Sequence, residues 1–313
     1  MMRNAALLAL LAVLLLLAPA FVYPATLMTI LCFAVFACSF NLMLGYAGLL
    51  CFGHAMFFGA GAYVTGYVLK NTTWPPELGI MAAMIAMAVL GLLVGLVCIR
   101  KAGIQFAMIT FAIAQFVYFV HLRAPFTGGE DGMQSIPRRP VLGVIDVTAD
   151  ATYYYVVLTI SVVALLAFYR IVHSPFGEAL KAVRDNDPRM ESLGFKPDRL
   201  KLLGLVLAAG LAGLAGGLKA TVFQIATLND LSFVISFEVI LMTLLGGLGT
   251  LSGPIVGAIV IVVLNDQLAA FGEWALIAQG AILLVVIIFF RKGFVGELNA
   301  LIEKRRAALS ARG

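Results

Sequence analysis

Few ionisable or polar residues of this chain lie within its apolar runs, and these few are the candidates for chemistry. Glu238 lies within an apolar run, and an acid at the centre of such a run costs about 2.5 to 3.5 kcal/mol if the run spans a membrane. That cost requires either a salt bridge, with Lys219 as the candidate partner, or a water-filled path, and the sequence leaves both open. Lys219 and Asp266 stand near the ends of their runs, where snorkelling to the interface is expected. Other polar residues within apolar runs are His54, Gln115 and Asn265.

Motifs of catalytic and nucleotide-binding sites do not occur in the sequence. It contains no GxxxxGK[ST] phosphate-binding loop, no HExxH zinc motif and no GxSxG nucleophile motif. The four cysteines lie in apolar segments without CxxC spacing, so we expect core residues rather than disulfides or a metal site. We therefore expect no enzyme activity and no cofactor in this chain, and any ATP must be bound by another chain.

Composition defines the broad class. The chain has 313 residues, of which 62% are hydrophobic and 12% charged, and its mean hydropathy is +1.05. These values are typical of an integral membrane protein, in which a spanning helix needs roughly 20 apolar residues. We predict an all-α polytopic membrane protein with about ten transmembrane segments. The expected spans are 5–22, 25–44, 47–69, 78–99, 103–122, 152–172, 202–222, 232–248, 254–271 and 273–290.

Basic residues predict the orientation, because Lys and Arg in short loops stay on the cytoplasmic side. Ten spans with both termini inside place most of the 21 basic residues in the cytoplasm, including those of 170–201 and of the tail 291–313. In the reverse orientation the basic residues on the cytoplasmic side would be mainly Arg123, Arg138 and Arg139, which are too few to set the topology. The net charge of +5 is thus a topology signal rather than evidence of nucleic-acid binding.

The N-terminal segment has a basic start, an apolar core and an Ala18-Pro19-Ala20 ending that imitates a cleavage site. We expect a first spanning helix, because a second apolar run follows at once, with cleavage as the alternative. No linker divides the chain, so residues 1–313 are expected to form one membrane domain.

A polar insert at 174–201 interrupts the apolar runs. Phe176, Ala179, Leu180 and Val183 follow an i, i+3, i+4, i+7 spacing, which predicts a short helix with one apolar face. Ser174-Pro175 and Asp187-Pro188 supply two helix starts, and Gly194 is placed to end the second helix. The apolar face requires a partner, which from the pattern alone is either a lipid headgroup layer or another protein.

Glycines gather in two segments, 45–61 and 246–254, which both begin Leu-Gly-x-x-Gly-x-Leu. Close helix packing explains most glycines, since pairs such as Gly91 and Gly95 have GxxxG spacing. The alternative is a broken helix whose freed backbone groups line a cavity, and 47–69 is the least secure span for this reason. His54 beside Gly53 is expected to be a hydrogen-bonded packing residue.

The ordered series of motifs resembles LivM-type permeases, the membrane subunits of branched-chain amino acid ABC transporters. The resemblance rests on five segments that cover nearly the whole chain, with Leu49, Cys51 and Gln115 as local departures from the usual residue types. The five are 41–48 with 52–63, 103–110, Thr127-Gly128-Gly129, 177–194, and 244–250 with Gly253-Pro254.

The resemblance implies a LivH-like second permease, two cytoplasmic ATPase subunits that bind ATP and Mg²⁺, and an extracytoplasmic solute-binding protein, in a bacterial-type inner membrane. It makes 174–201 the cytoplasmic coupling segment and 123–151 the extracytoplasmic loop. The implied coupling residues are Phe176, Gly177, Glu178, Ala179, Leu180, Val183, Arg184, Glu191 and Gly194. Candidate pathway residues are Asn41, Gly45, Gly48, Gly53, His54, Gln115, Glu238, Gly246, Gly247 and Gly249. Thr127, Gly128 and Gly129 are the implied outer gate or binding-protein contact.

The implied function is import of leucine, isoleucine, valine or related amino acids by alternating access, driven by ATP hydrolysis in partner subunits. Two rivals remain. A secondary transporter would need a coupling-ion site, for which Glu238 is the candidate, and would follow a proton or sodium gradient. A membrane scaffold would show no uptake in any assembly.

Overall fold

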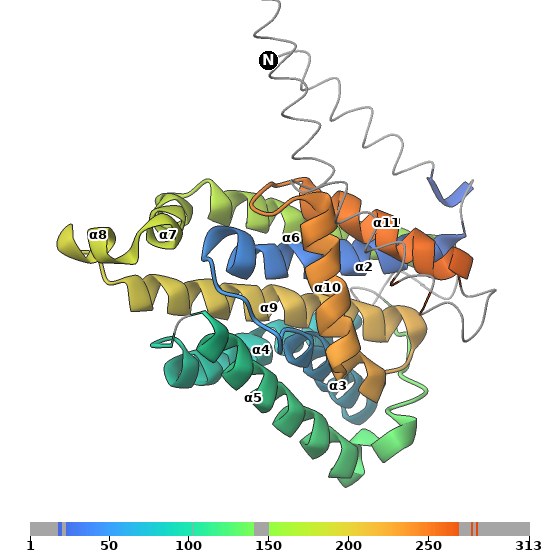
Figure 1. Ribbon diagram of the computed structural model, residues 1–313. Helices are drawn as coiled ribbons and strands as arrows, with labels where there is room; N and C mark the ends of the chain where they lie inside the picture. The colour runs from blue at the N-terminus through green and yellow to red at the C-terminus, as the bar shows by residue number, and fades with distance from the viewer. Residues whose placement is uncertain are drawn as a thin grey trace, which may run out of the picture.

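The computed structural model describes residues 18–20, 23–101, 103–140, 150–268, 277 and 280, and this part of the chain is helical (Figure 1). Its only extended pairing within these ranges is an isolated bridge between Met133 and Ala226. Most of the expected spans 5–22 and 273–290 and the whole basic tail 291–313 lie outside the described residues. The expectations about N-terminal cleavage and about the two termini therefore stay predictions.

Five described helices are long and apolar enough to cross a membrane. They are α2 with its π-helical extension η2 (Pro24–Asn41 and Leu42–Tyr46), α4 (Pro76–Cys98), α5 (Ile104–Arg123), α6 (Asp150–Val172) and α9 (Pro197–Phe223). Shorter helices are α3 (Ala55–Asn71), α7 (Pro175–Asp185), α8 (Asp187–Ser192), α10 (Phe233–Gly246) and α11 (Gly253–Leu268). Single turns occur at η1 (Ala18–Ala20), η3 (Pro125–Thr127), η4 (Gly129–Asp131) and η5 (Leu228–Leu231). The predicted all-helical class is confirmed, whereas the total of ten spans stays a prediction.

The expected span 47–69 is wrong in its first third, because α3 begins only at Ala55. The chain leaves the helical path after Tyr46, where Gly48 adopts a positive φ of 71° that residues with a side chain rarely adopt. The amide of Leu49 then donates to the carbonyl of Met43, at 2.9 Å. The predicted break in this segment is therefore present, and it lies before the helix rather than inside it.

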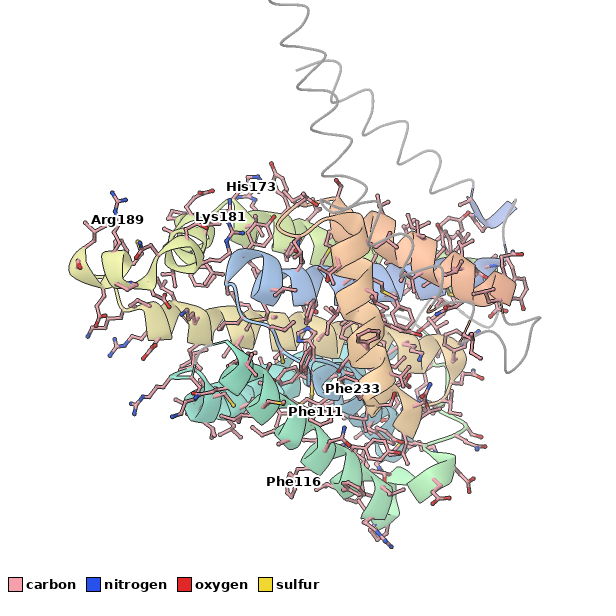
Figure 2. The ribbon with its side chains drawn as sticks, in the orientation of Figure 1. Phe111, Phe116, His173, Lys181, Arg189 and Phe233 are labelled. Atoms are coloured by element: carbon pink, nitrogen blue, oxygen red, sulfur yellow. The ribbon has the colours of Figure 1, made fainter. Side chains whose placement is uncertain are left out.

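Helix α9 occupies the centre of the arrangement (Figure 1). It packs against α4 and α3 on one side and α2 on the other, while α10 and α11 pack against each other and against α2. Outward-facing side chains such as Phe116 on α5 project from the bundle (Figure 2), as expected for a surface that meets lipid.

Glycines allow these helices to approach closely, which confirms the packing interpretation of their spacing. A Cβ at Gly91 of α4 would lie 2.5 Å from the Cβ of Ala209, and one at Gly216 of α9 would lie 1.8 Å from the carbonyl oxygen of Phe58. Both distances are below the limit of atomic contact, so a side chain at either position forces two helices apart.

We expect the substitution Gly216→Ala to destabilise the protein by about 1 to 3 kcal/mol, because the added methyl overlaps backbone of α3. The measurement is the thermal unfolding midpoint of the purified protein in detergent. Gly204→Ala is the matched control on the same helix, since its Cβ would stand at an ordinary 3.5 Å from Leu180. Equal midpoints for the two variants would contradict the packing argument.

Candidate functional site

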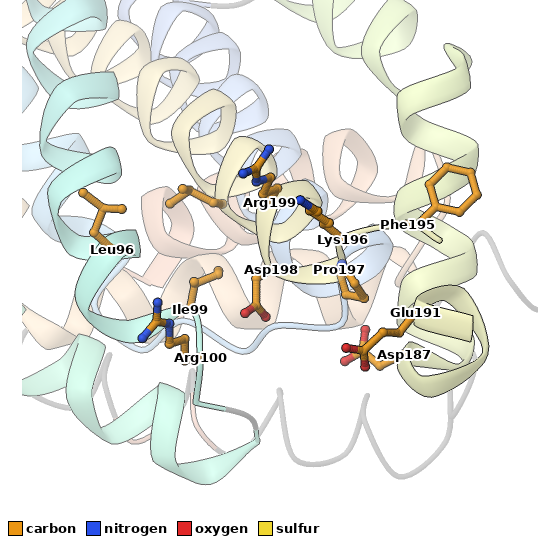
Figure 3. Close-up of a pocket in the computed structure, with 11 residues that line it drawn as sticks. Leu96, Ile99, Arg100, Asp187, Glu191, Phe195, Lys196, Pro197, Asp198 and Arg199 are labelled. Atoms are coloured by element: carbon orange, nitrogen blue, oxygen red, sulfur yellow. The ribbon is translucent and has the colours of Figure 1, made fainter. Parts of the chain in front are cut away.

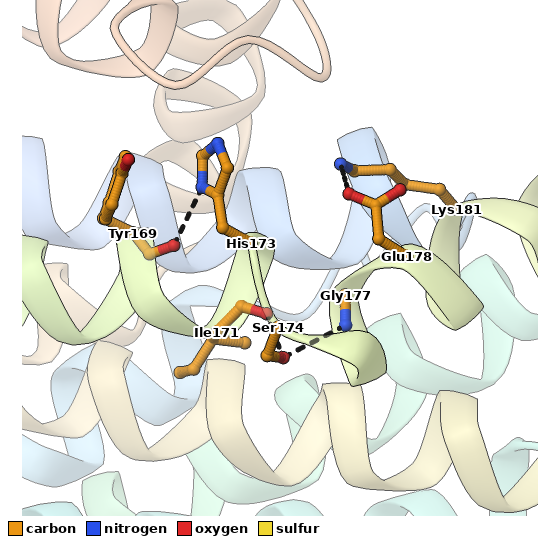
Figure 4. A network of polar contacts seen from close by, with 7 residues as sticks. All are labelled: Tyr169, Ile171, His173, Ser174, Gly177, Glu178 and Lys181. Carbon is orange, nitrogen blue, oxygen red and sulfur yellow. Dashed lines mark hydrogen bonds and ion pairs between the residues drawn. The ribbon is translucent and has the colours of Figure 1, made fainter.

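The two short helices α7 and α8 have the starts that the sequence predicts. The Ser174 hydroxyl accepts a hydrogen bond from the amide of Gly177 at 3.3 Å, which caps α7 ahead of Pro175 (Figure 4). Asn186 caps α8 in the same way, accepting from the amide of Arg189 at 3.0 Å. The chain turns out of α8 at Gly194, whose φ is 85°. This local chemistry fixes where the short helices begin and end.

The apolar face of α7 already has a partner within the chain. Leu180 and Val183 are 0% and 1% exposed, and α7 packs on α9 and η2. Phe176 and Ala179 are half-buried, and Gly177 is buried against the end of α6. The face that remains outside is charged, and it includes Glu178, which forms an ion pair with Lys181 at 2.8 Å (Figure 4).

Asn41 joins the two glycine segments. Its side-chain amide donates to the carbonyl of Thr250 at 2.8 Å, and its side-chain oxygen accepts from the amide of Gly249 at 3.0 Å. Asn41 is fully buried, and a Cβ at Gly45 would lie 2.1 Å from its side-chain oxygen. One side chain thus satisfies two backbone groups of the turn between α10 and α11.

Arg184 of α7 extends to the point where Asn41 binds the turn between α10 and α11. Its guanidinium donates to the carbonyl of Gly45, and its Nη1 would lie 3.4 Å from a Cβ at Gly249. A Cβ at Gly48 would stand 2.7 Å from Arg184 Cγ, so the absence of a side chain there admits the arginine stem. Asp185 holds the other edge of the guanidinium, at 2.9 Å. We call the group of Asn41, Gly45, Gly48, Arg184 and Gly249 the glycine junction.

A second contact links α7 to the first glycine segment. The Lys181 ammonium lies 5.5 Å from the centre of the Tyr46 ring, a cation–π distance. Tyr46 in turn packs edge-on against Phe168 of α6. The neighbouring Glu191 on α8 is exposed and makes no contact with the glycine junction. Arg189 of α8 points away from the core in the side-chain view (Figure 2).

The turn between α10 and α11 is compact. A Cβ at Gly246 would lie 1.8 Å from the carbonyl oxygen of Gly253, and Gly247 has a φ of 118°. The Thr250 hydroxyl accepts from the amide of Gly253 at 3.1 Å and donates to the carbonyl of Gly247 at 2.8 Å. The second glycine segment therefore serves both as a tight helix crossing and as a wall of the junction.

His54 lies apart from the junction, in an aromatic pocket. Its Nε2 is 2.9 Å from the Ser39 hydroxyl, and its ring stacks on Phe36 and meets Phe40 edge-on. A Cβ at Gly53 would lie 2.2 Å from the carbonyl oxygen of Thr110, which brings this segment against α5. The geometry is that of a packed, hydrogen-bonded histidine. Gln115 is half-buried on α5 and takes no part in the junction contacts.

The ion pair in the core is not the pair of Lys219 and Glu238 that the sequence offered as one of two alternatives. Lys219 pairs with Asp230 of η5 rather than with Glu238, and its ammonium also lies 5.7 Å from the Phe58 ring centre. Asp230 is 2% exposed and accepts from the Thr227 amide and hydroxyl. The position of Lys219 relative to the membrane interface stays a prediction. Glu238 accepts from the Asn265 side chain at 3.4 Å.

The predicted outer-gate residues form a structured turn. The Thr127 hydroxyl lies 2.7 Å from the carbonyl of Ala124, and Gly128 and Gly129 have φ angles of 84° and 61°. Farther along, Arg138 donates to the carbonyl oxygens of Thr221 and Val222 at the end of α9. The described part of this loop, 123–140, is thus bonded to the end of α9.

Asp230 and the contact of Arg184 with Gly45 were missed by sequence reasoning. Asp230 follows Lys219 by 11 residues in a turn bounded by Thr227, and a capping-box pattern at Thr227 was the available signal. No local signal pairs Arg184 with a carbonyl 139 positions away. Within the described residues, no cluster of His, Cys, Asp and Glu is placed to bind a metal.

We expect Asn41→Leu to expose the turn it holds, because the amide of Gly249 and the carbonyl of Thr250 lose their partners. The cost is roughly 1 to 3 kcal/mol for a buried unsatisfied group. Hydrogen–deuterium exchange of a peptide covering 247–252 measures the effect as faster exchange. Asn71→Leu is the control, since its amide bonds only the Tyr67 carbonyl at an exposed helix end. Unchanged exchange in the Asn41 variant would contradict the bridge.

We expect Lys219→Met and Asp230→Asn each to cost about 3 to 5 kcal/mol, because either change leaves a buried group without its partner. The double variant should cost clearly less than the sum of the two. Equilibrium unfolding in mixed micelles supplies the three values of this cycle. The exposed pair Glu178 and Lys181 is the control, with a coupling below about 1 kcal/mol. Additive losses at Lys219 and Asp230 would show that the two residues act independently.

The structure defines a class: a multi-span helical membrane protein with broken apolar helices joined at a part-buried polar junction and short amphipathic helices beside it. The comparison with known families is specific. The chain belongs to the family of permease components of branched-chain amino acid transport systems, whose model matches residues 22–290.

Relatives with established names support the assignment. The chain is 27% identical over 283 residues to the high-affinity branched-chain amino acid transport system permease protein LivM of Escherichia coli K12. That match covers 82% of this chain and 65% of LivM, so it spans less than two thirds of the relative. The chain is also 22% identical to the permease protein LivH of Salmonella typhimurium over 85% of this chain and 91% of LivH. No solved structure matches the chain.

Proposed function

We propose that this chain is one permease subunit of an ATP-driven importer that carries branched-chain or related amino acids across the inner membrane of a bacterium. The family match over 22–290 and the names of the LivM and LivH relatives support the substrate class. The chain supplies the membrane path, and partner ATPase subunits bind ATP and Mg²⁺.

The observation that carries the mechanism is the position of Arg184. It belongs to α7, which lies outside the long helices, yet it bonds the carbonyl of Gly45 in the first glycine segment and lies beside Gly249 in the second. Asn41 locks these two segments to each other. A displacement of α7 therefore acts on both broken helices at one point, and alternating access follows when the segments separate and rejoin.

The contact with an ATPase falls on the outward face of α7 and α8. Leu180 and Val183 hold α7 on its own chain, so their role in coupling is to transmit movement inward. Glu178 and Glu191 are exposed and available to a partner surface. A polar contact of this kind sets register and orientation, while the buried apolar side makes α7 move together with α9 and η2.

The remaining partners follow from similarity and topology. Likeness to both LivM and LivH supports a pair of related permease subunits around one path. The Lys and Arg distribution supports both termini, the coupling segment 174–201 and the tail 291–313 in the cytoplasm. The loop 123–151, with Thr127, Gly128 and Gly129 in its folded turn, then faces an extracytoplasmic solute-binding protein.

The test is Arg184→Gln in the complete complex reconstituted in proteoliposomes. We expect ATP hydrolysis to continue while leucine uptake per ATP falls about tenfold, which corresponds to roughly 1.4 kcal/mol of coupling. The reason is that α7 can still move with the ATPase but no longer bonds the Gly45 carbonyl. Uptake driven by an ion gradient without ATP would instead favour a secondary transporter.

The matched control is Arg170→Gln, which removes an exposed arginine of α6, outside the two short helices proposed to meet the ATPase. This variant should keep both hydrolysis and uptake. An Arg184→Gln complex with the uptake per ATP of the unmodified complex would refute the coupling role of the junction. Absence of leucine, isoleucine and valine uptake in the unmodified complex would refute the substrate class.

A further inference from the structure

A hollow lined by charged residues opens where the end of α4 meets α8 and the start of α9 (Figure 3). Its volume is about 590 Å³, and Arg100, Lys196 and Arg199 contribute basic groups to its wall. Leu96, Phe195 and Leu202 line it as well, so the wall is both charged and apolar. None of the contacts of the glycine junction involves these residues.

A second hollow lies on the same pair of helices. It has a volume of about 400 Å³ and an almost wholly apolar wall, formed by α4, α6 and α9. Leu92 of α4, Ala167 of α6 and Val206 of α9 are among its lining residues. Leu92 and Val89 are 40% and 52% exposed, so the groove opens to the surroundings of the bundle.

The two hollows lie end to end. On α4, Leu92 lines the apolar groove and Leu96 lines the charged hollow; on α9, Val206 and Leu202 do the same. Residues four apart share one face of a helix and stand about one turn, or roughly 6 Å, from each other. A single elongated molecule therefore fits with one end among charges and the rest among apolar side chains.

The charge of the first hollow favours one negative group. Asp187 is bonded to Lys201, which neutralises it. Three cations, Arg100, Lys196 and Arg199, then face the two carboxylates of Glu191 and Asp198, which leaves one positive charge in excess. Among the described residues, none of these five side chains forms a salt bridge of its own. A phosphodiester carries the single negative charge that restores balance.

We propose that the two hollows form one binding site for an anionic glycerophospholipid of the leaflet on the side of α7 and α8. The phosphodiester lies among Arg100, Lys196 and Arg199, and an acyl chain lies in the groove between α4, α6 and α9. Basic pockets beside membrane helices bind such headgroups through charge and hydrogen bonds. The bound lipid fills the space between α8 and the long helices, and this site does not depend on the transported substrate.

The occupant is a lipid rather than a soluble anion because the apolar groove continues from the charged hollow. A free phosphate would use only the charged end, and its apolar neighbour would stay empty. A protein partner would cover the basic residues without entering the groove between α4 and α9. These alternatives give different results when the two ends are altered separately.

The full-length protein is purified in detergent with mixed micelles of phosphatidylglycerol and phosphatidylcholine. Native mass spectrometry then measures how much phosphatidylglycerol the protein retains. Arg100→Gln with Arg199→Gln removes two charges from the headgroup end, and Ala167→Trp fills the groove from an exposed position. We expect each change to lower retention of phosphatidylglycerol about tenfold. Ala167→Leu makes the same test with a smaller side chain if the tryptophan variant fails to accumulate.

Two controls make the same kinds of change, loss of a charge and gain of bulk, away from the site. Arg189→Gln removes an exposed arginine of α8, and Leu166→Trp enlarges an exposed residue of α6, and neither residue lines either hollow. Both should retain phosphatidylglycerol at the unmodified level. One contrary result is that only the double arginine variant loses phosphatidylglycerol and that inorganic phosphate displaces it from the unmodified protein. That result would identify the site as one for a free anion and overturn the proposal. Equal retention in all variants would also overturn it.

Discussion

A helix that breaks inside an apolar protein leaves backbone amides and carbonyls that lipid cannot bind, and each must find a partner within the chain. Asn41 meets this requirement for the turn between α10 and α11, because its side chain both donates to Thr250 and accepts from Gly249. The requirement dictates the neighbouring sequence as well. Gly45 has no side chain because the amide of Asn41 occupies that volume, and Gly48 has none because the stem of Arg184 does. The break, the glycines and the arginine are thus consequences of one hydrogen-bonding problem.

The burial of α7 changes how a partner meets this protein. An amphipathic helix beside a membrane usually offers its apolar side to another surface, whereas Leu180 and Val183 are already covered by α9 and η2. What faces outward is a row of charges around Glu178. A contact made through charges is reversible and sensitive to orientation, and the buried side keeps α7 attached to the long helices while that contact forms and breaks.

Much of the fold was predictable because long apolar runs and strong helix starts are local signals. Ser174-Pro175 specifies the start of α7 through an amide cap and a fixed φ, and the apolar runs specify α4, α5, α6 and α9 to within a few residues. The start of α3 was not predictable, because residues 47–54 are as apolar as a helix and only the backbone geometry at Gly48 excludes one. Lys219 illustrates the other limit. The sequence suggested Glu238 as its partner because Glu238 is an acid within an apolar run. In the structure the η5 turn places Asp230 against Lys219 instead. The coupling and pathway residues remain predictions, now located in space.

Helix α9 is fastened at both of its ends. At one end Lys201 forms an ion pair with Asp187 of α8, and at the other Arg138, in the loop between α5 and α6, donates to the carbonyls of Thr221 and Val222. A helix of 27 residues is roughly 40 Å long, which is comparable to the thickness of a membrane. Because both ends of α9 are bonded to other segments, a tilt of this helix displaces those segments together. The short helices α7 and α8 and the loop that follows α5 are therefore mechanically connected through α9, although they lie at its opposite ends.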